Sequence, residues 1–153
     1  MPYIMGQSAK SAEAGLPLQR SMYLEFSSDP NTTGLEDQYM LGEDLLIAPL
    51  FEAKQESCQV YLPVGSDWVD FFTREVYEGG KWHTIASSDL QGIALVRSGS
   101  IIPMVPVSLT TRDIDWDALY AVAYGDSEED SILTYDPNQN SYTYLDRQQV
   151  QIR

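Results

Sequence analysis

The chain has 153 residues, of which 43% are hydrophobic and 11% aromatic, so it is able to bury the core of roughly one globular domain. Its formal net charge of -14 and its pI near 4.1 argue against binding to nucleic acid or to anionic membranes, because both are polyanions that would repel it. The charge does not argue against neutral ligands such as sugars.

The first 44 residues mix helical and strand-like segments. "MPYIMGQSAKSAEAG" predicts a helix over residues 1–14, because small residues share one face and a glycine and a proline follow. In "LQRSMYLEF", residues 18–26, apolar and polar side chains alternate as in a strand, apart from Arg20 on the apolar face. "LEDQYML" then predicts a short helix at about residues 35–42, ended by Gly42.

From residue 45 on, strand candidates follow one another at short intervals. Turn signals such as "PVGSD", "EGG" and "RSGS" separate them, which is typical of an antiparallel sandwich. The candidate segments are "LLIAPLF", "CQVYLP", "WVDFF", "KWHTIA", "IALVR", "SIIPMV", "LYAVAY", "SILTY" and "SYTYLD". A lone strand among helices has no partners for its backbone hydrogen bonds, so the first 44 residues are expected to belong with something larger.

Several of these segments resemble one known family. "MPYIM", "EAGLPLQRSMYLEF" and "LEDQYMLGEDLLIAPLFE" resemble the end of the catalytic barrel of glycoside hydrolase family 31, the α-glucosidases and α-xylosidases. "VYLPVGSDWVDFFTREVYEGGKW" and "GIALVRSGSIIPM" are similar to the β-sandwich that follows this barrel. The likeness fades beyond residue 107, where "SILTYDPNQNSYTYLD" is similar to the opening of the family's last β domain.

The resemblance implies three regions. Residues 1–44 would be the C-terminal end of a (β/α)8 catalytic barrel, residues 45–106 the proximal C-terminal β-sandwich, and residues 107–153 the start of a distal β domain, for which a truncation stays open. The expected fold class is therefore mainly β, an antiparallel β-sandwich preceded by the last helix-strand-helix of the barrel. Residues 18–26 would be the eighth barrel strand.

The resemblance also implies a function. Family members hydrolyse α-linked glucose or xylose from the non-reducing end with retention, which requires two carboxyl groups about 5 Å apart. In the family both are aspartates on earlier barrel strands, so they are expected to lie before residue 1. The chain would then be a scaffold, inactive alone, with the rest of the barrel as its partner and an α-linked oligosaccharide as the substrate of the full enzyme. Xylose and glucose are not distinguished.

Within this chain, no catalytic residue is predicted. Glu25 and Phe26 are expected nearest to the substrate, because such barrels keep their sites at the C-terminal ends of the strands. Asp70 in "WVDFF" fits the opening of the family's nucleophile motif, a tryptophan, any residue and an aspartate. Phe71 and Phe72 stand where that motif has methionine and asparagine, so an aromatic core strand is favoured.

No metal or cofactor is predicted. The lone Cys58 excludes an intrachain disulfide and a thiolate cluster, and His83 is expected to be structural or exposed. No secretory signal or apolar run of ~20 residues is found, which predicts a cytoplasmic location. Two acidic runs have carboxylates at alternate positions, as in a calcium loop: Asp113, Asp115 and Asp117, and Asp126, Glu128 and Asp130. Both lack the glycine and the glutamate that such a loop needs. Solvated loops are therefore favoured over irregular calcium sites.

Two hypotheses remain, and the aromatic residues bear on both. Trp68, Trp82 and Trp116 are expected in the core, least strongly Trp116; the alternative is a carbohydrate-binding surface. Beside the scaffold hypothesis stands a stand-alone β-sandwich carbohydrate-binding or interaction module, which would hold residues 18–26 inside the sandwich. The scaffold hypothesis instead predicts apolar surface exposed in the isolated chain by Ile4, Met5, Leu18, Met22 and Leu24.

Overall fold

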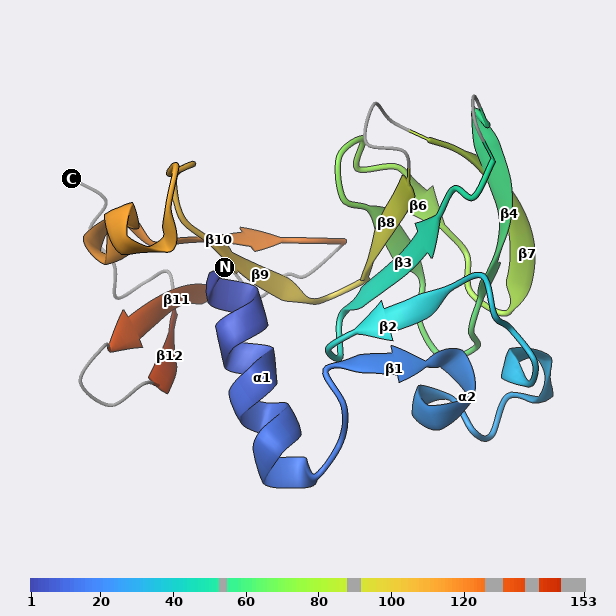
Figure 1. Cartoon of the computed structure of the whole chain (residues 1–153), viewed down its shortest axis with the longest axis horizontal. Helices are drawn as coiled ribbons and strands as arrows, with labels where there is room; N and C mark the ends of the chain where they lie inside the picture. The colour runs from blue at the N-terminus through green and yellow to red at the C-terminus, as the bar shows by residue number, and fades with distance from the viewer. Residues whose placement is uncertain (53–54, 88–91, 126–130, 137–140, 147–153) are drawn as a thin grey trace.

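The computed structural model describes residues 1–52, 55–87, 92–125, 131–136 and 141–146 (Figure 1). Among the described residues, no helix is long and apolar enough to cross a membrane. The elements in chain order are α1 (Pro2–Ala14), β1 (Gln19–Ser21), α2 (Met22–Glu25), η1 (Pro30–Thr32), β2 (Tyr39–Leu41), β3 (Leu45–Pro49), β4 (Ser57–Leu62), β5 (Trp68–Asp70), β6 (Val76–Tyr77), β7 (Lys81–Ala86), β8 (Gly92–Arg97), β9 (Ile101–Met104), η2 (Thr111–Asp113), η3 (Trp116–Ala118), β10 (Tyr120–Ala123), β11 (Ser131–Asp136) and β12 (Ser141–Asp146).

The strands form one central sheet and three smaller ones. The central sheet has six strands in the order β1-β2-β3-β8-β5-β6, and each neighbouring pair is antiparallel. Three antiparallel pairs accompany it: β4 with β7, β9 with β10, and β11 with β12. Figure 1 shows β4 and β7 at the end of the molecule away from α1, β9 and β10 beside the N-terminal end of α1, and β11 and β12 on its other side. The predicted antiparallel, mainly β fold is confirmed.

The central sheet is buried on both faces. On β3, Leu46 and Ala48 enter a core shared with β4 and β7, whereas Leu45 points into a second core that contains Tyr3 of α1. Residues alternate between the two faces of a strand, so a strand covered on both faces needs an unbroken apolar run. This explains "LLIAP", whose neighbours β8 and β5 divide in the same way, with Leu95 facing one core and Val96 the other.

The helix predicted over residues 1–14 is present as α1. Gly15 follows it in the left-handed conformation, with φ of 66°, and Leu16 N–H donates to the carbonyl of Ser11. A side chain at this φ would be strained, which is why glycine ends the helix.

Two predicted elements in the first 44 residues are wrong. The strand expected over residues 18–26 stops at Ser21, whose hydroxyl accepts the Leu24 N–H at 3.3 Å and caps the helical turn α2. The helix expected at about residues 35–42 is not formed; Tyr39–Leu41 is strand β2, and Gly42, with φ of 70°, lies in the turn to β3. Pairing with β1 and β3 gives β2 partners on both sides, which outweighs local helix propensity.

The central sheet also continues across the proposed boundary at residue 44. β1 pairs with β2 and β2 pairs with β3, both antiparallel, so the first predicted strand is a sheet edge in this chain and has a partner. From residue 45 on, each predicted strand segment contains a strand, and the short β6 is the one described strand there that the sequence did not predict.

The side chain of Gln38 joins the central sheet to β4. Its carboxamide donates to the carbonyl of Tyr61 at 2.7 Å and accepts the Tyr61 N–H at 2.9 Å, as a neighbouring strand would. The Tyr61 hydroxyl donates to the Asp29 carboxylate at 2.8 Å and accepts from the Asn31 carboxamide at 3.0 Å. Gln38, Tyr61 and Asp29 are all buried. Tyr61 is therefore fixed at both its backbone and its hydroxyl.

The Gln38 bridge is tested by Gln38→Ala. This change leaves two buried backbone groups of Tyr61 without partners, and we expect the free energy of unfolding to fall by about 2–3 kcal/mol in urea denaturation. Gln59→Ala, on the exposed part of β4, is the matched control and should stay within about 0.5 kcal/mol. Equal effects of the two variants would contradict the bridge.

The Asp29 carboxyl group makes the stability of the fold depend on pH in the acid range. Burial acts to raise the pKa of its carboxyl, but hydrogen bonds from Tyr61, Val64 and Asn31 outweigh burial and hold the pKa below its usual value. A lowered pKa stabilises the fold above the unfolded value near 4, and this stabilisation is lost as the pH falls through the folded pKa.

We therefore expect the stability difference between the wild type and Asp29→Asn to be full at about pH 6 and to shrink below about pH 4. Thermal unfolding of both proteins across this pH range measures it. A difference that stays constant down to about pH 3 would show that the Asp29 charge contributes nothing.

Candidate functional site

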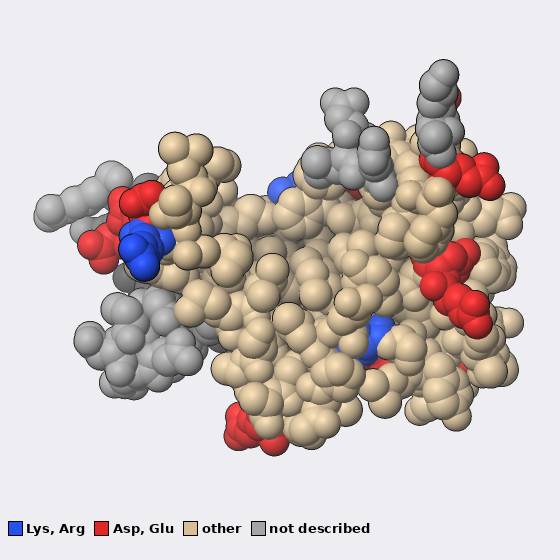
Figure 2. Space-filling view, viewed as in Figure 1, with Lys and Arg blue, Asp and Glu red and all other residues tan. Residues whose placement is uncertain are grey.

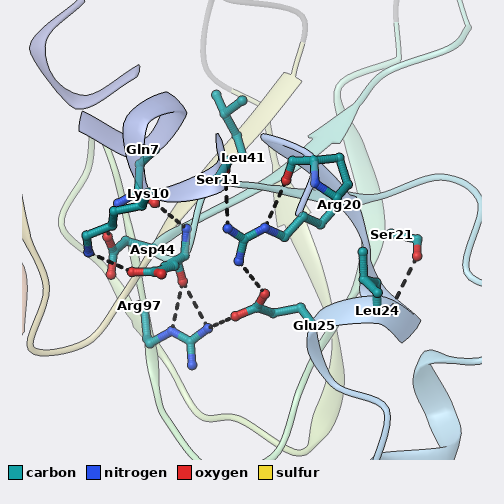
Figure 3. A network of polar contacts seen from close by, with 12 residues as sticks. Gln7, Lys10, Ser11, Arg20, Ser21, Leu24, Glu25, Leu41, Asp44 and Arg97 are labelled. Atoms are coloured by element: carbon teal, nitrogen blue, oxygen red, sulfur yellow. Dashed lines mark hydrogen bonds and ion pairs between the residues drawn. The ribbon is translucent and has the colours of Figure 1, made fainter. Parts of the chain in front are cut away.

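Side chains of helix α1 make hydrogen bonds to the turn between β2 and β3. The Tyr3 hydroxyl accepts the Asp44 N–H at 3.0 Å. The Gln7 carboxamide accepts the Glu43 N–H at 3.2 Å and donates to the Asp44 carboxylate at 3.3 Å (Figure 3). Burial, followed by the nearby Asp44 carboxylate, raises the pKa of Tyr3, so its phenol stays neutral. The Gln7 side chain also occupies the space where a Cβ on Gly42 would lie, 2.6 Å away. The turn therefore requires glycine.

Beside this contact, Arg20, Glu25 and Arg97 form a charged cluster. One carboxylate oxygen of Glu25 lies 2.8 Å from the Arg20 guanidinium, and the other lies 3.5 Å from the Arg97 guanidinium (Figure 3). The side chains are 3%, 19% and 30% exposed for Arg20, Glu25 and Arg97. The charged cluster thus joins β1, α2 and β8 through one carboxylate.

The other N–H groups of the two arginines donate to backbone carbonyls and to a side chain of α1. Arg20 donates to the Pro17 carbonyl at 3.0 Å and to the Ser11 hydroxyl of α1 at 3.4 Å. Arg97 donates twice to the Glu43 carbonyl, at 3.2 and 2.9 Å. With these bonds satisfied, the buried guanidinium of Arg20 and the partly buried one of Arg97 act as connectors between elements.

Phe26 lies next to the charged cluster. The Arg97 guanidinium lies 5.1 Å from the centre of the Phe26 ring and 5.5 Å from the Trp68 ring, within range of a cation–π interaction. Phe26 meets the buried Trp68 edge to face, with ring centres 6.2 Å apart. Within the described residues, the indole N–H of Trp68 is the one buried side-chain polar atom without a hydrogen-bond partner.

The structure brings together the two residues predicted nearest to the substrate. Glu25 ends α2, Phe26 follows it, and both contact Arg97. Each oxygen of the Glu25 carboxylate faces a guanidinium, so the group is paired on both sides and is not a free acid or base. That Glu25 and Phe26 approach a substrate stays a prediction.

Large apolar side chains are exposed on α1, on the loop after it and on α2. We call this set the helical apolar surface; it consists of Met1, Ile4, Met5, Leu16, Tyr23 and Leu24. Figure 2 shows the side of the molecule carrying α1 and β1 as largely without charged groups. Of the five residues expected to be exposed, Ile4, Met5 and Leu24 are, whereas Leu18 is half-buried and Met22 is buried. The exposure fits the scaffold hypothesis, and the position of β1 within the sheet fits the module hypothesis.

Asp70 has a structural role. One oxygen of its carboxylate accepts the N–H groups of Phe72 at 2.8 Å and Thr73 at 2.7 Å, which caps the turn after β5. Trp68 on the same strand is fully buried, and Phe71 stacks on Tyr124 with ring centres 5.6 Å apart. The prediction of an aromatic core strand agrees with these contacts.

The other candidate sites are held by local contacts. The His83 ring lies 2.8 Å from the Glu78 carbonyl, and Asp115 accepts the Asp117 N–H at 3.1 Å. Asp113 accepts the Thr110 hydroxyl at 2.7 Å. Within the described residues, no group of three or more His, Cys, Asp or Glu side chains is placed to hold a metal ion. The second acidic run, residues 126–130, lies outside them.

The three tryptophans have different environments. Trp68 is in the core as predicted, Trp116 is half-buried, and Trp82 is 50% exposed on β7. The core prediction is therefore wrong for Trp82. The sequence also missed the charged cluster, although Arg20 on the apolar face of "LQRSMYLEF" signalled it.

Comparison with known proteins gives a family match. Residues 15–102 match the family model described as the glycosyl hydrolase family 31 C-terminal domain. α-Glucosidase 2 of Bacillus thermoamyloliquefaciens is 30% identical over 145 residues, which cover 94% of this chain and 18% of that protein. An α-xylosidase of Lactiplantibacillus pentosus is 40% identical over 106 residues, 67% of this chain and 14% of that protein.

Solved structures agree with the sequence matches. The crystal structure of the GH31 α-xylosidase from Xanthomonas citri is similar with a TM-score of 0.76 and 31% identity, covering 94% of this chain and 16% of that one. A Flavobacterium johnsoniae GH31 dextranase complexed with glucose has a TM-score of 0.74 and 26% identity, covering 89% of this chain and 17% of that one. The chain thus spans less than a fifth of the length of these relatives.

The charged cluster is tested by Glu25→Ala. Removing the carboxylate leaves two guanidinium groups without it, one of them buried, and we expect the free energy of unfolding in urea to fall by about 2–3 kcal/mol. Lys10→Ala is the control, because it breaks the Lys10–Glu43 pair, whose side chains are 58% and 43% exposed, and should cost about 0.5 kcal/mol or less. Equally small losses would show that the cluster does not join the elements.

Proposed function

The chain belongs to glycosyl hydrolase family 31, and from this membership we propose that it is the C-terminal scaffold of a retaining α-glycosidase. The observation that carries the proposal is the match of residues 15–102 to the C-terminal domain of the family. The full enzyme would hydrolyse terminal α-linked xylose or glucose, since relatives named α-xylosidase and α-glucosidase are both similar to this chain.

In this proposal the two catalytic aspartates lie upstream of the chain. Retaining hydrolysis requires a nucleophile and an acid/base facing each other across the bond. Three carboxylates in this chain that are buried or partly buried make structural contacts instead. Asp29 accepts from Tyr61, Asp70 caps a turn, and Glu25 lies between two arginines. Because these carboxylates make structural contacts, they favour a scaffold role for this chain over a catalytic one.

We propose that the upstream barrel packs against the helical apolar surface. Residues 1–44 would contribute the end of the barrel, residues 45–106 the proximal sandwich and residues 107–153 the start of the distal domain. The charged cluster would hold Glu25 and Phe26 at the side that faces the barrel, because it ties α2 to both β1 and β8. Isolated apolar residues are common on protein surfaces, but several large ones on α1, on the loop after it and on α2 favour a partner.

The second candidate is a stand-alone carbohydrate-binding or interaction module. It is favoured by one observation, the pairing of β1 with β2 inside the central sheet. Such a module would be a compact monomer that needs no further chain.

The scaffold proposal predicts that the chain alone does not hydrolyse p-nitrophenyl α-xyloside or α-glucoside. Release of p-nitrophenol is the measurement, with the intact mass of 17.2 kDa checked in the same sample. Turnover that disappears in Asp70→Asn would overturn the proposal, because the nucleophile would then lie in this chain.

Self-association distinguishes the two candidates. The scaffold proposal predicts that the isolated chain associates through the helical apolar surface, and that Leu24→Lys reduces the association in sedimentation velocity runs. Tyr120→Lys on β10 is the matched control, because Tyr120 and Leu24 are both 46% exposed. A chain that stays monomeric at all concentrations would favour the stand-alone module.

A further inference from the structure

The pair β4 and β7 has two chemically different faces. Directly paired residues share a face, and residues two apart along a strand share it too. One face is apolar, with Val60 and Ile85 buried in the core. The opposite face, which we call the outer face, carries three cross-strand pairs: Tyr61 with Trp82, Gln59 with Thr84, and Ser57 with Ala86.

The outer face carries a supported aromatic side chain. The rings of Trp82 and Tyr61 have centres 5.5 Å apart with planes inclined by 54°. Tyr61 is itself fixed by Gln38, Asp29 and Asn31, so the surface beneath the indole is rigid. Half of the Trp82 surface stays exposed. A rigid, half-exposed ring loses little conformational freedom when a flat ligand stacks on it.

Polar side chains lie beside this ring. Gln59 and Thr84 form the next pair on the outer face, and both are exposed. Two residues along a strand span about 7 Å, a distance comparable to one sugar ring. Gln59 offers an amide donor and acceptor, and Thr84 offers a hydroxyl, which can both donate and accept.

The outer face offers no ionised side chain to a ligand. None of its six residues is ionisable apart from the Tyr61 phenol, whose pKa is raised by burial and by its bond to Asp29, although the chain contains 23 acidic residues. The negative field of the whole chain repels anions. A neutral ligand with one apolar face and several hydroxyl groups meets these conditions, and a pyranose ring has both.

We propose that Trp82 is the stacking platform of a carbohydrate-binding site on the outer face, with Gln59 and Thr84 as hydrogen-bonding partners of the sugar hydroxyls. The ligand is a neutral, α-linked oligosaccharide. The choice of α-linked glucose units rests on the proposed function, whereas the site rests on the geometry of β4 and β7. Figure 1 places these strands at the end of the molecule away from α1.

The test is a titration of the full chain with isomaltotriose and, in parallel, maltotriose, followed by tryptophan fluorescence. We expect saturable binding with a dissociation constant on the order of 1 mM for at least one of them. Trp82→Ala, followed by calorimetry because it removes the fluorescent reporter, should weaken this binding by about tenfold or more, since the stacking surface is lost. Phe72→Ala is the matched aromatic control, since Phe72 is 46% exposed on another part of the surface, and it should leave the affinity unchanged.

Two further variants guard against a merely structural role for Trp82. Trp82→Tyr keeps a flat ring and should retain affinity within about threefold, followed by calorimetry because the reporter is lost. Thr84→Val keeps the shape of an exposed side chain, removes its hydroxyl and should weaken binding by about threefold. If Trp82→Ala does not fold, these two variants decide the question.

Three outcomes would overturn the site. They are no saturable binding of either sugar, binding that Trp82→Ala leaves unchanged, and binding that Phe72→Ala weakens as much as Trp82→Ala does. Hydrolysis is not measured in this titration. Failure of the proposed catalytic scaffold and failure of this binding site therefore give separate results.

Discussion

The structure depends on a central sheet that has to be covered on both faces. Its middle strands β3, β8 and β5 send apolar side chains in both directions, so neither face tolerates water. The pair β4 and β7 covers one face, and α1 with β9 and β10 covers the other. The positions of the smaller elements therefore follow from the two apolar faces that they cover. Their opposite faces form the surface of the protein.

Polar side chains fix how these layers meet. Gln38 imitates a strand partner at Tyr61, Gln7 and Tyr3 hold α1 to the turn after β2, and the charged cluster ties α2 to β1 and β8. Apolar packing alone has no direction, whereas hydrogen bonds specify position. A scaffold that supports a catalytic barrel benefits from such positions, because small displacements of supporting elements alter an active site.

Much of the fold could be predicted from the sequence, because its signals are local. The end of α1 at Gly15 and the strands from residue 45 on follow from turn residues and apolar runs. The helical turn after Ser21 and strand β2 could not be predicted, since their states depend on a cap and on pairing with distant strands. That Glu25 and Phe26 lie near a substrate stays a prediction. Glu25 and Phe26 come from the family resemblance, but their contacts with Arg97 join residues far apart in the sequence.

The central claim is that this chain supports an upstream barrel through its helices. Hydrogen exchange of residues 1–26 tests it most directly, measured in the chain alone and in the same chain joined to the proposed upstream barrel. We expect slower exchange of α1 and α2 amides in the longer protein, with β4 and β7 unchanged, because the barrel would cover the helices and leave these strands open. Identical exchange of residues 1–26 in both proteins would contradict it.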